Sequence, residues 1–190
     1  ILTNKLSSHF VTKAEDIRPL FQTQLEACGV DYFDFYLMHA QDKNSFQKYK
    51  EIRAYEISLE LMAEGKFKHF GISFHDTADV LDRILTRHPE MEFVQLQINY
   101  LDWEDEKVQS RLCYEVARKH GKDIIVMEPV KGGKLADVPE KVKELFGDVK
   151  VCVVSDDVVA GFHLDSVKSE LDRNHIANEQ FIFPHGENSK

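Results

Sequence analysis

The sequence lacks any apolar run of the length needed to cross a membrane. Among its 190 residues, no mostly apolar run exceeds about eight residues, whereas a transmembrane helix needs roughly twenty. The chain also begins at Ile1 without an initiator methionine, and no charged segment precedes an apolar one near its start. From these absences we expect a processed or truncated chain without a secretory signal peptide, located in the cytoplasm.

Cysteine is scarce and widely spaced. The three cysteines, Cys28, Cys113 and Cys152, are odd in number and far apart, which favours reduced thiols in a cytosolic protein over a disulfide framework. No cysteine or histidine pair has the spacing of a zinc site, although the chain contains nine histidines. The sequence therefore predicts no metal site.

Positive charge is also in short supply. The 24 Lys and Arg residues are outnumbered by 33 Asp and Glu residues, which gives a net charge of −9, and no basic stripe interrupts the chain. Such a chain repels phosphate backbones and anionic membranes, so we expect neither nucleic acid nor a membrane as a partner. Apolar residues, by contrast, make up 43% of the chain and include 13 Phe. That content is sufficient for a buried core and argues against disorder.

Short apolar runs alternate with longer stretches of helical periodicity. Five such runs recur roughly every thirty residues, which is the length of one β-α-β unit. They span residues 1–6, 33–39, 69–75, 93–99 and 123–129. This alternation predicts parallel strands joined by helices.

Helix signals fill the intervals between these runs. The predicted helices run from near Asp16 to Gly29, from Asn44 or Ser45 to Gly65, from Asp76 or Thr77 to Pro89, and from about Glu104 to His120. In the last of them Val108, Leu112 and Val116 fall on one face at intervals of four residues. We expect that face to point into the core.

Beyond about Asp148 the alternation of strands and helices is lost. A sixth strand is predicted over residues 149–154 and a short helix over 164–171, with irregular structure at 155–157, 161–163 and 181–190. We therefore divide the chain into residues 1–147, which contain the regular βα units, and a divergent or irregular tail of residues 148–190.

Polar residues end several of the predicted strands. They are Lys5, His39, Ser73, His75, Gln95, Asn99 and Glu128. Each of them, taken alone, is an ordinary residue of a strand or a strand end. The carboxyl ends of parallel strands meet at one edge of a sheet or barrel, however, and ligands bind there. We therefore expect these side chains to line a common pocket.

Five segments resemble successive signatures of the aldo/keto reductase family. They are residues 11–16 (VTKAED), 25–39 (LEACGVDYFDFYLMH), 65–75 (GKFKHFGISFH), 94–100 (VQLQINY) and 126–135 (VMEPVKGGKL). The chain most resembles the bacterial branch whose full-length members carry a C-terminal iron–sulfur extension, and the resemblance covers residues 1–147. It implies a (β/α)₈ barrel that binds NADPH or NADH and reduces a small-molecule aldehyde or ketone.

The resemblance also implies roles for the strand-end residues. In the family's mechanism a hydride moves from the nicotinamide to the carbonyl carbon while a tyrosine donates the proton, and a lysine paired with an aspartate lowers that tyrosine's pKa. Lys5 is similar to that lysine, and His39 is similar to the histidine that orients the carbonyl oxygen.

Five further residues match positions that contact the cofactor in the family. Ser73 and Gln95 correspond to the serine and glutamine that hold the nicotinamide carboxamide, and Asn99 to the asparagine that follows. Met127 stands where many members stack an aromatic ring on the nicotinamide, and Glu128 would line the pyrophosphate side. The choice between NADP and NAD stays open.

The chain departs from the family at both ends of the matched region. The family's catalytic aspartate and tyrosine belong to the first two βα units, which would precede Ile1, and Tyr32, Tyr36 and Tyr100 lie in motifs that do not replace them. No cysteine cluster is present in the sequence, so no iron–sulfur cluster is expected. We predict a partial TIM-type barrel of about five to six parallel βα units, the third to the seventh of the family's eight.

Two functions stay open. The first is an NAD(P)H-dependent reductase that is inactive or weak as this isolated chain, because the aspartate and the proton-donating tyrosine are missing. The second is a non-catalytic truncated barrel fragment that acts as an oligomerising or nucleotide-binding module. Since five or six strands cannot close a barrel of eight, we expect the open strand edges to pair with a second copy of the chain.

Overall fold

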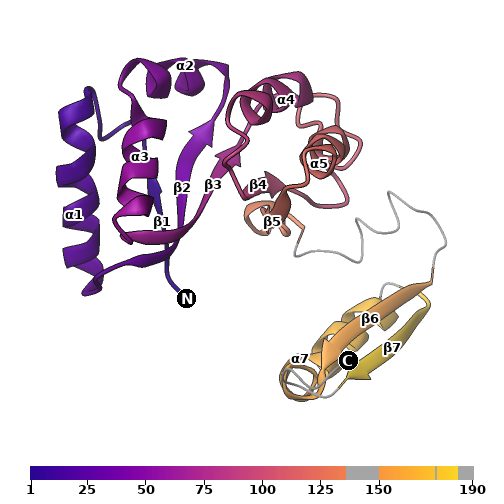
Figure 1. Ribbon diagram of the computed structural model, residues 1–190. Coiled ribbons are helices and arrows are strands. Elements are labelled where there is room, and N and C mark those ends of the chain that lie inside the picture. Colours follow the sequence, from indigo (N-terminus) through magenta and orange to yellow (C-terminus); the bar gives the residue numbers. More distant parts are fainter. Residues whose placement is uncertain (136–149, 174, 184–190) are drawn as a thin grey trace. The chain divides into compact units, whose positions relative to one another are not determined.

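The chain forms two units, and the larger one is built on a parallel sheet. The computed structural model describes residues 1–135, 150–173 and 175–183 (Figure 1). The larger unit comprises residues 1–129 and the smaller one residues 130–190. All of the predicted site residues lie in the larger unit.

The sheet of the larger unit contains all five predicted strands, paired in their order along the chain. They are β1 (Thr3–Leu6), β2 (Phe33–Gln41), β3 (Phe67–Phe74), β4 (Phe93–Gln97) and β5 (Asp123–Met127). Every neighbouring pair is parallel, and the order across the sheet is β1-β2-β3-β4-β5. The predicted succession of parallel βα units is confirmed.

Helices connect the strands and flank them (Figure 1). They are η1 (Ala14–Asp16), α1 (Ile17–Cys28), α2 (Lys43–Glu51), α3 (Ala54–Ala63), α4 (Ala78–Arg87) and α5 (Ser110–Lys119). The Asp16 carboxylate accepts hydrogen bonds from Thr12 and Lys13 and so fixes the turn that opens α1. At its other end Gly29 has a φ of 65°, a left-handed conformation that glycine adopts without steric cost.

The helix predicted between residues 44 and 65 is in fact two helices. After α2, Arg53 takes a left-handed conformation with a φ of 56°, and α3 begins at the next residue. In one continuous helix Tyr49 and Tyr55 would lie about 120° apart around the helix axis and point in different directions. The break lets both enter the core, where their ring centroids are 6.4 Å apart. Core packing therefore overrides the helical periodicity.

The fourth helix differs from the prediction in its start and in its buried face. α5 begins at Ser110, later than predicted, because the Asp105 carboxylate holds the preceding residues in turns by accepting two backbone N–H groups. Leu112, which was expected to point inward, is 40% exposed. The buried side chains are instead Ser110, Cys113 and Ala117. These small residues allow the helix backbone to approach its neighbours closely.

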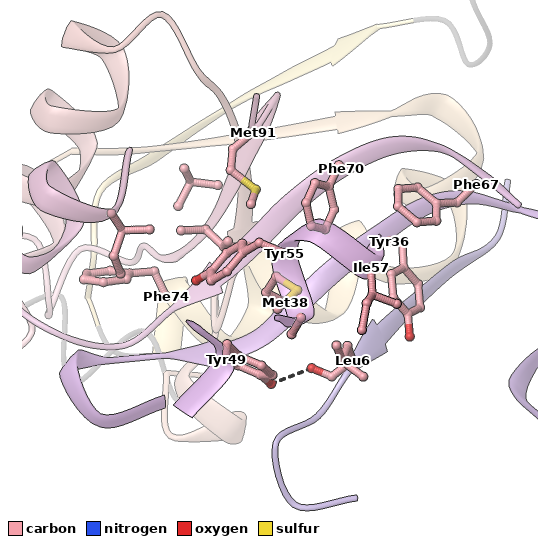
Figure 2. Packing of buried hydrophobic residues seen from close by; sticks show 14 of the residues in the cluster. Leu6, Tyr36, Met38, Tyr49, Tyr55, Ile57, Phe67, Phe70, Phe74 and Met91 are labelled. Carbon is pink, nitrogen blue, oxygen red and sulfur yellow. Dashed lines mark hydrogen bonds between the residues drawn. The ribbon is translucent and has the colours of Figure 1, made fainter. Parts of the chain in front are cut away.

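Aromatic rings fill the space between the sheet and its helices. Phe21 of α1 lies edge-on to Phe33 and Tyr36 of β2, with centroid distances of 5.6 and 4.8 Å. Such pairs contribute about 0.5–1.5 kcal/mol each beyond the burial of their surface. Figure 2 shows the neighbouring part of this core, in which the Tyr49 hydroxyl also reaches the end of β1.

The sheet is curved, and its concave face lies away from the helices. Lys5 on β1 and Gln95 on β4 are separated by three strand spacings, or about 14 Å in a flat sheet. In a flat sheet their side chains would stand parallel to each other, yet Lys5 Nζ lies 3.0 Å from Gln95 Oε1. The strands are therefore arranged as part of a (β/α) barrel wall.

Gly71 of β3 permits close packing on this concave face. A Cβ atom at Gly71 would lie 2.6 Å from both the ring and the carbonyl oxygen of Phe93 on β4. Phe93 is almost fully buried and also meets the Phe35 ring edge-on, with the centroids 5.4 Å apart. Because Gly71 has no side chain, the Phe93 ring can pack directly against the β3 backbone.

The smaller unit contains a β-α-β motif that the sequence predicted only in part. Its elements are η2 (Lys131–Gly133), β6 (Val151–Asp156), α7 (Asp157–Arg173) and β7 (Asn178–Phe183), with β6 and β7 parallel. Residues 161–163, expected to be irregular, lie inside α7, since Gly161 lowers helix propensity without breaking the helix. The predicted boundary at residue 147 lies outside the described residues. None of the described helices is long and apolar enough to span a membrane.

Replacing Gly71 by alanine tests the packing of the concave face. We expect Gly71→Ala to lower the free energy of unfolding by about 1–3 kcal/mol, the usual cost of overpacking a core, as measured by urea denaturation. Gly161→Ala is the control, because a Cβ there meets no atom within 4 Å. A G71A variant as stable as the wild type would contradict the described packing.

Candidate functional site

Two predicted site residues on strands β1 and β4, which are not neighbours in the sheet, are in direct contact. Lys5 Nζ donates a hydrogen bond of 3.0 Å to Gln95 Oε1 on the concave face. Because the amide oxygen of Gln95 is used by Lys5, the amide nitrogen is left to donate to a ligand. The pair thus offers both a positive charge and an oriented donor.

His39, near the end of β2, is half-buried beside this pair. Burial lowers its pKa, and the positive charge of Lys5 and the neighbouring His75 and His9 lower it further. The imidazole is therefore held neutral at pH 7, and one ring nitrogen donates while the other accepts. A neutral donor of this kind can hydrogen-bond to the oxygen of a carbonyl group.

His75 shares the electrostatic environment of His39. Burial lowers the pKa of His75, the charge of Lys5 lowers it further, and Glu128 and Asp42 act in the opposite direction. The sequence placed His75 among the polar strand ends, but the family resemblance gave it no role. Within the described residues, no group of three His, Cys, Asp or Glu side chains is arranged to hold a metal ion.

Ser73, at the end of β3, supports the backbone next to His39. Its hydroxyl oxygen accepts a hydrogen bond of 2.8 Å from the backbone N–H of Ala40. Ala40 has a φ of 50° and lies where the pairing of β2 with β3 shifts register. Since the oxygen acts as the acceptor, this bond does not use the hydroxyl hydrogen of Ser73, but the residue is only 1% exposed.

Asn99 is occupied by contacts within the protein. Its Nδ2 donates to Asp102 at 2.7 Å and to the carbonyl oxygen of Glu128 at 3.1 Å. Its Oδ1 accepts from the backbone N–H groups of Leu101 and Asp102. These four bonds use the full capacity of the amide, so a ligand would have to displace one of them.

Met127 and Glu128 lie at the end of the outer strand β5. Met127 is half-buried and pairs with Gln97 of β4. Glu128 is exposed and left-handed, with a φ of 56°, and Asn99 holds its carbonyl oxygen. The contact with Asn99 therefore fixes the position of the β5 end relative to β4.

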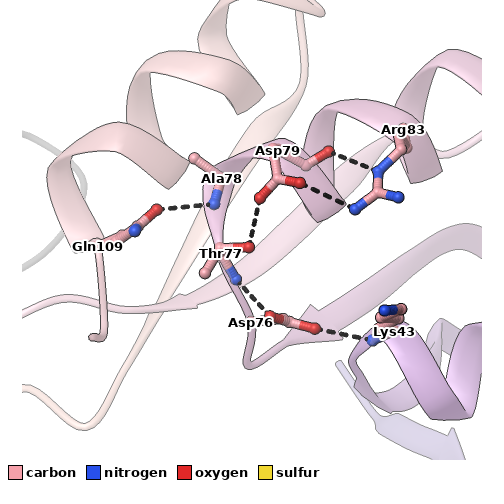
Figure 3. Close-up of polar contacts among 7 residues, drawn as sticks. All are labelled: Lys43, Asp76, Thr77, Ala78, Asp79, Arg83 and Gln109. Carbon is pink, nitrogen blue, oxygen red and sulfur yellow. Dashed lines mark hydrogen bonds and ion pairs between the residues drawn. The ribbon is translucent and has the colours of Figure 1, made fainter. Parts of the chain in front are cut away.

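Polar contacts tie the loops at this edge to one another (Figure 3). The Asp76 carboxylate accepts from the backbone N–H of Thr77 and, in α2, from that of Lys43, both at 2.8 Å. Gln109 Oε1 accepts from the backbone N–H of Ala78 at 3.1 Å. Three successive βα connections are thus joined into one rim by the protein's own groups.

The buried tyrosines do not provide the proton donor that the resemblance implies. Burial raises the pKa of Tyr36, Tyr49 and Tyr55, that of Tyr49 to about 12. Tyr36 donates to Gln24 and Tyr55 to Gln41. A general acid needs a pKa shifted toward the operating pH, which is the opposite direction.

Comparison with known proteins identifies one family. Residues 1–156 match the model of the aldo/keto reductase family. None of the curated proteins compared with the chain matches it.

Solved structures of the same kind share the fold of the chain. An aldo/keto reductase from Brucella melitensis is 22% identical over 97% of this chain and 61% of its own, with a TM-score of 0.55. A second, from a Medee basin deep-sea metagenome library, is 18% identical over 95% of this chain and 59% of its own (TM-score 0.57). A third, from Klebsiella pneumoniae in complex with NADPH, is 19% identical over 76% of this chain and 46% of its own (TM-score 0.52). The chain thus spans roughly half to three fifths of the length of these proteins.

Replacing Ser73 tests its support of the His39 backbone. We expect Ser73→Ala to lower the free energy of unfolding by about 1–3 kcal/mol, because the Ala40 N–H loses its acceptor. Ser58→Ala is the matched control, since Ser58 is equally buried but, among the described residues, its hydroxyl makes only a weak hydrogen bond of 3.7 Å to the sulfur of Met38. Urea denaturation measures both variants, and equal losses would contradict the assigned role of Ser73.

Proposed function

Because the chain belongs to the aldo/keto reductase family, we propose that it forms the cofactor- and carbonyl-binding edge of an NAD(P)H-dependent reductase of aldehydes or ketones. The observation that carries the proposal is the contact of 3.0 Å between Lys5 and Gln95 across the concave face. These two residues are 90 positions apart in the chain, and the family resemblance assigns both to one site. His39 and Ser73 lie near the carboxyl ends of β2 and β3, the two strands between them.

The residues at this edge fit the carboxamide of a nicotinamide cofactor, NADP or NAD. Ser73 has a hydroxyl hydrogen to donate, and Gln95 has its amide nitrogen. Asn99, which the resemblance also places among the cofactor-binding residues, is saturated by internal bonds. We therefore assign carboxamide binding to Ser73 and Gln95 and a supporting task to Asn99, with Met127 and Glu128 beside the cofactor.

When bound, the nicotinamide supplies the hydride. The task of His39 is to donate a hydrogen bond to the carbonyl oxygen, and its lowered pKa keeps the ring in the neutral form. The charge of Lys5 stabilises negative charge that develops on that oxygen. The chemistry asked of these two residues is orientation and electrostatic stabilisation rather than proton transfer.

Turnover by this chain alone should be weak. The sequence contains no counterpart of the family's aspartate and tyrosine in their motifs, and loss of a general acid costs about a hundredfold to ten-thousandfold in rate. Within the family we propose that the chain belongs to the bacterial branch related to iron–sulfur members, on the combined resemblance of its five matched segments. No iron–sulfur cluster is proposed for this chain.

Cofactor titration tests the proposed function. We expect NADPH or NADH to bind with a change in nicotinamide fluorescence, and Gln95→Ala to weaken binding about tenfold, which is the effect of one lost hydrogen bond. Gln47→Ala is the control, because Gln47 is an exposed glutamine on α2 whose side chain, within the described part of the chain, hydrogen-bonds only to Glu51 and Lys50. Failure of both cofactors to bind would contradict the proposal, as would an unchanged affinity in the Q95A variant.

The open edges of the sheet favour self-association as a second candidate function. In the described part of the chain, the outer edges of β1 and β5 have no strand paired to them. Unpaired backbone N–H and C=O groups of this kind are templates for pairing with another strand. Val126 of β5 is also 50% exposed, which adds apolar surface at that edge. We propose that two copies of the chain pair through these edges.

Light scattering after gel filtration tests this pairing. We expect a species of twice the 22.0 kDa chain mass at micromolar concentration, and its dissociation to a monomer on dilution. A compact monomer at every concentration would overturn the pairing proposal. A dimer that binds neither NADPH nor NADH would favour the non-catalytic module over the reductase.

A further inference from the structure

Tyr49 of α2 reaches across the ends of the strands that carry Lys5 and His39. Its side chain is fully buried, and its hydroxyl donates a hydrogen bond of 2.7 Å to the carbonyl oxygen of Leu6 (Figure 2). The carbonyl oxygen of His39 lies 3.2 Å from the same hydroxyl. One hydroxyl hydrogen therefore serves two acceptors, of which Leu6 is the closer.

The two carbonyl groups lie where the hydrogen-bonded pairing of β1 with β2 ends. The pairing of β1 with β2 ends at Leu6 and Met38, and His39 is the next residue along β2. Buried carbonyl groups beyond the end of a ladder need another partner. Because Leu6 directly follows Lys5, the Tyr49 hydroxyl fixes the backbone beside both predicted catalytic residues at once.

The helix that carries Tyr49 is itself fixed to this edge of the sheet. The Asp42 carboxylate caps α2 by accepting from the backbone N–H groups of Asn44 and Ser45. Ser45 Oγ donates to the carbonyl oxygen of Ala40 at 2.9 Å. Lys48, the neighbour of Tyr49, donates to the carbonyl oxygen of Ser8 beyond β1. The position of the Tyr49 hydroxyl is therefore fixed by the position of α2.

We propose that Tyr49 is a positioning residue, which holds Lys5 and His39 at a fixed separation through the backbone carbonyl groups of Leu6 and His39. The functional meaning of that separation rests on the proposed reductase function. Tyr49 is not a proton donor, because it is buried and is committed to backbone acceptors. Its task is to keep the ends of β1 and β2 together in a sheet whose outer edge at β1 is open in the described residues.

The matched pair Tyr49→Phe and Tyr55→Phe separates positioning from general stability. Both tyrosines are at most 1% exposed and each donates one strong hydrogen bond, but Tyr55 donates to the side chain of Gln41. The readout is the pKa of His39 from NMR titration of the imidazole, with His39→Gln used to assign the signal. The groups that face His39 electrostatically are Lys5, His75 and His9.

We expect Y49F to raise the pKa of His39 toward its ordinary value near 6.5, since water enters and Lys5 moves away. The Y55F variant should leave the pKa of His39 unchanged while losing similar stability. An unchanged pKa in Y49F, or an equal rise in Y55F, would overturn the proposal.

A measurement on the wild-type chain tests the proposal even if the Y49F variant does not fold. The Tyr49 hydroxyl proton should give an NMR signal that exchanges slowly with water, because its oxygen is buried and its hydrogen is bonded to Leu6. Rapid exchange of that proton would overturn the proposal without any substitution. If neither NADPH nor NADH binds while Y49F still raises the pKa of His39, the proposed function fails and the positioning role of Tyr49 stands.

Discussion

The curvature of the parallel sheet is the constraint on which the rest of the structure depends. It brings Lys5 and Gln95 within 3.0 Å of each other although three strand spacings separate them. Curvature also explains why a glycine stands at position 71, since the Phe93 ring on the concave face occupies the space that a side chain would need. The same geometry that packs the interior therefore assembles the candidate site at the carboxyl ends of the strands.

The sheet was predictable from the sequence because its strands are short apolar runs with a regular spacing, and all five are present. Helix boundaries were less predictable, since they depend on tertiary contacts. The break at Arg53 exists because Tyr49 and Tyr55 both enter the core. The fully buried residues of α5 are small, so the apolar pattern was only partly right: Val116 packs against the core, whereas Leu112 is 40% exposed.

The site was predictable to the extent that it consists of strand ends. The family resemblance assigned Lys5 and Gln95 to one site but did not predict the hydrogen bond between them. The internal hydrogen bonds of Ser73 and Asn99 could not be predicted from the sequence either. Both residues bond to the backbone of distant segments, and any residue can offer such a partner. The contact of Tyr49 with Leu6 is of the same kind. These backbone contacts hold the site together without a ligand.

The central claim is that residues 1–129 form the curved sheet, with the candidate site already assembled, before any cofactor binds. Hydrogen–deuterium exchange of the isolated chain, resolved to single amides by NMR, tests this claim most directly. The account predicts slow exchange through β2, β3 and β4 in the absence of NADPH and NADH, with faster exchange along the outer edges of β1 and β5. Exchange of all five strands at the rate of an unfolded chain would contradict it.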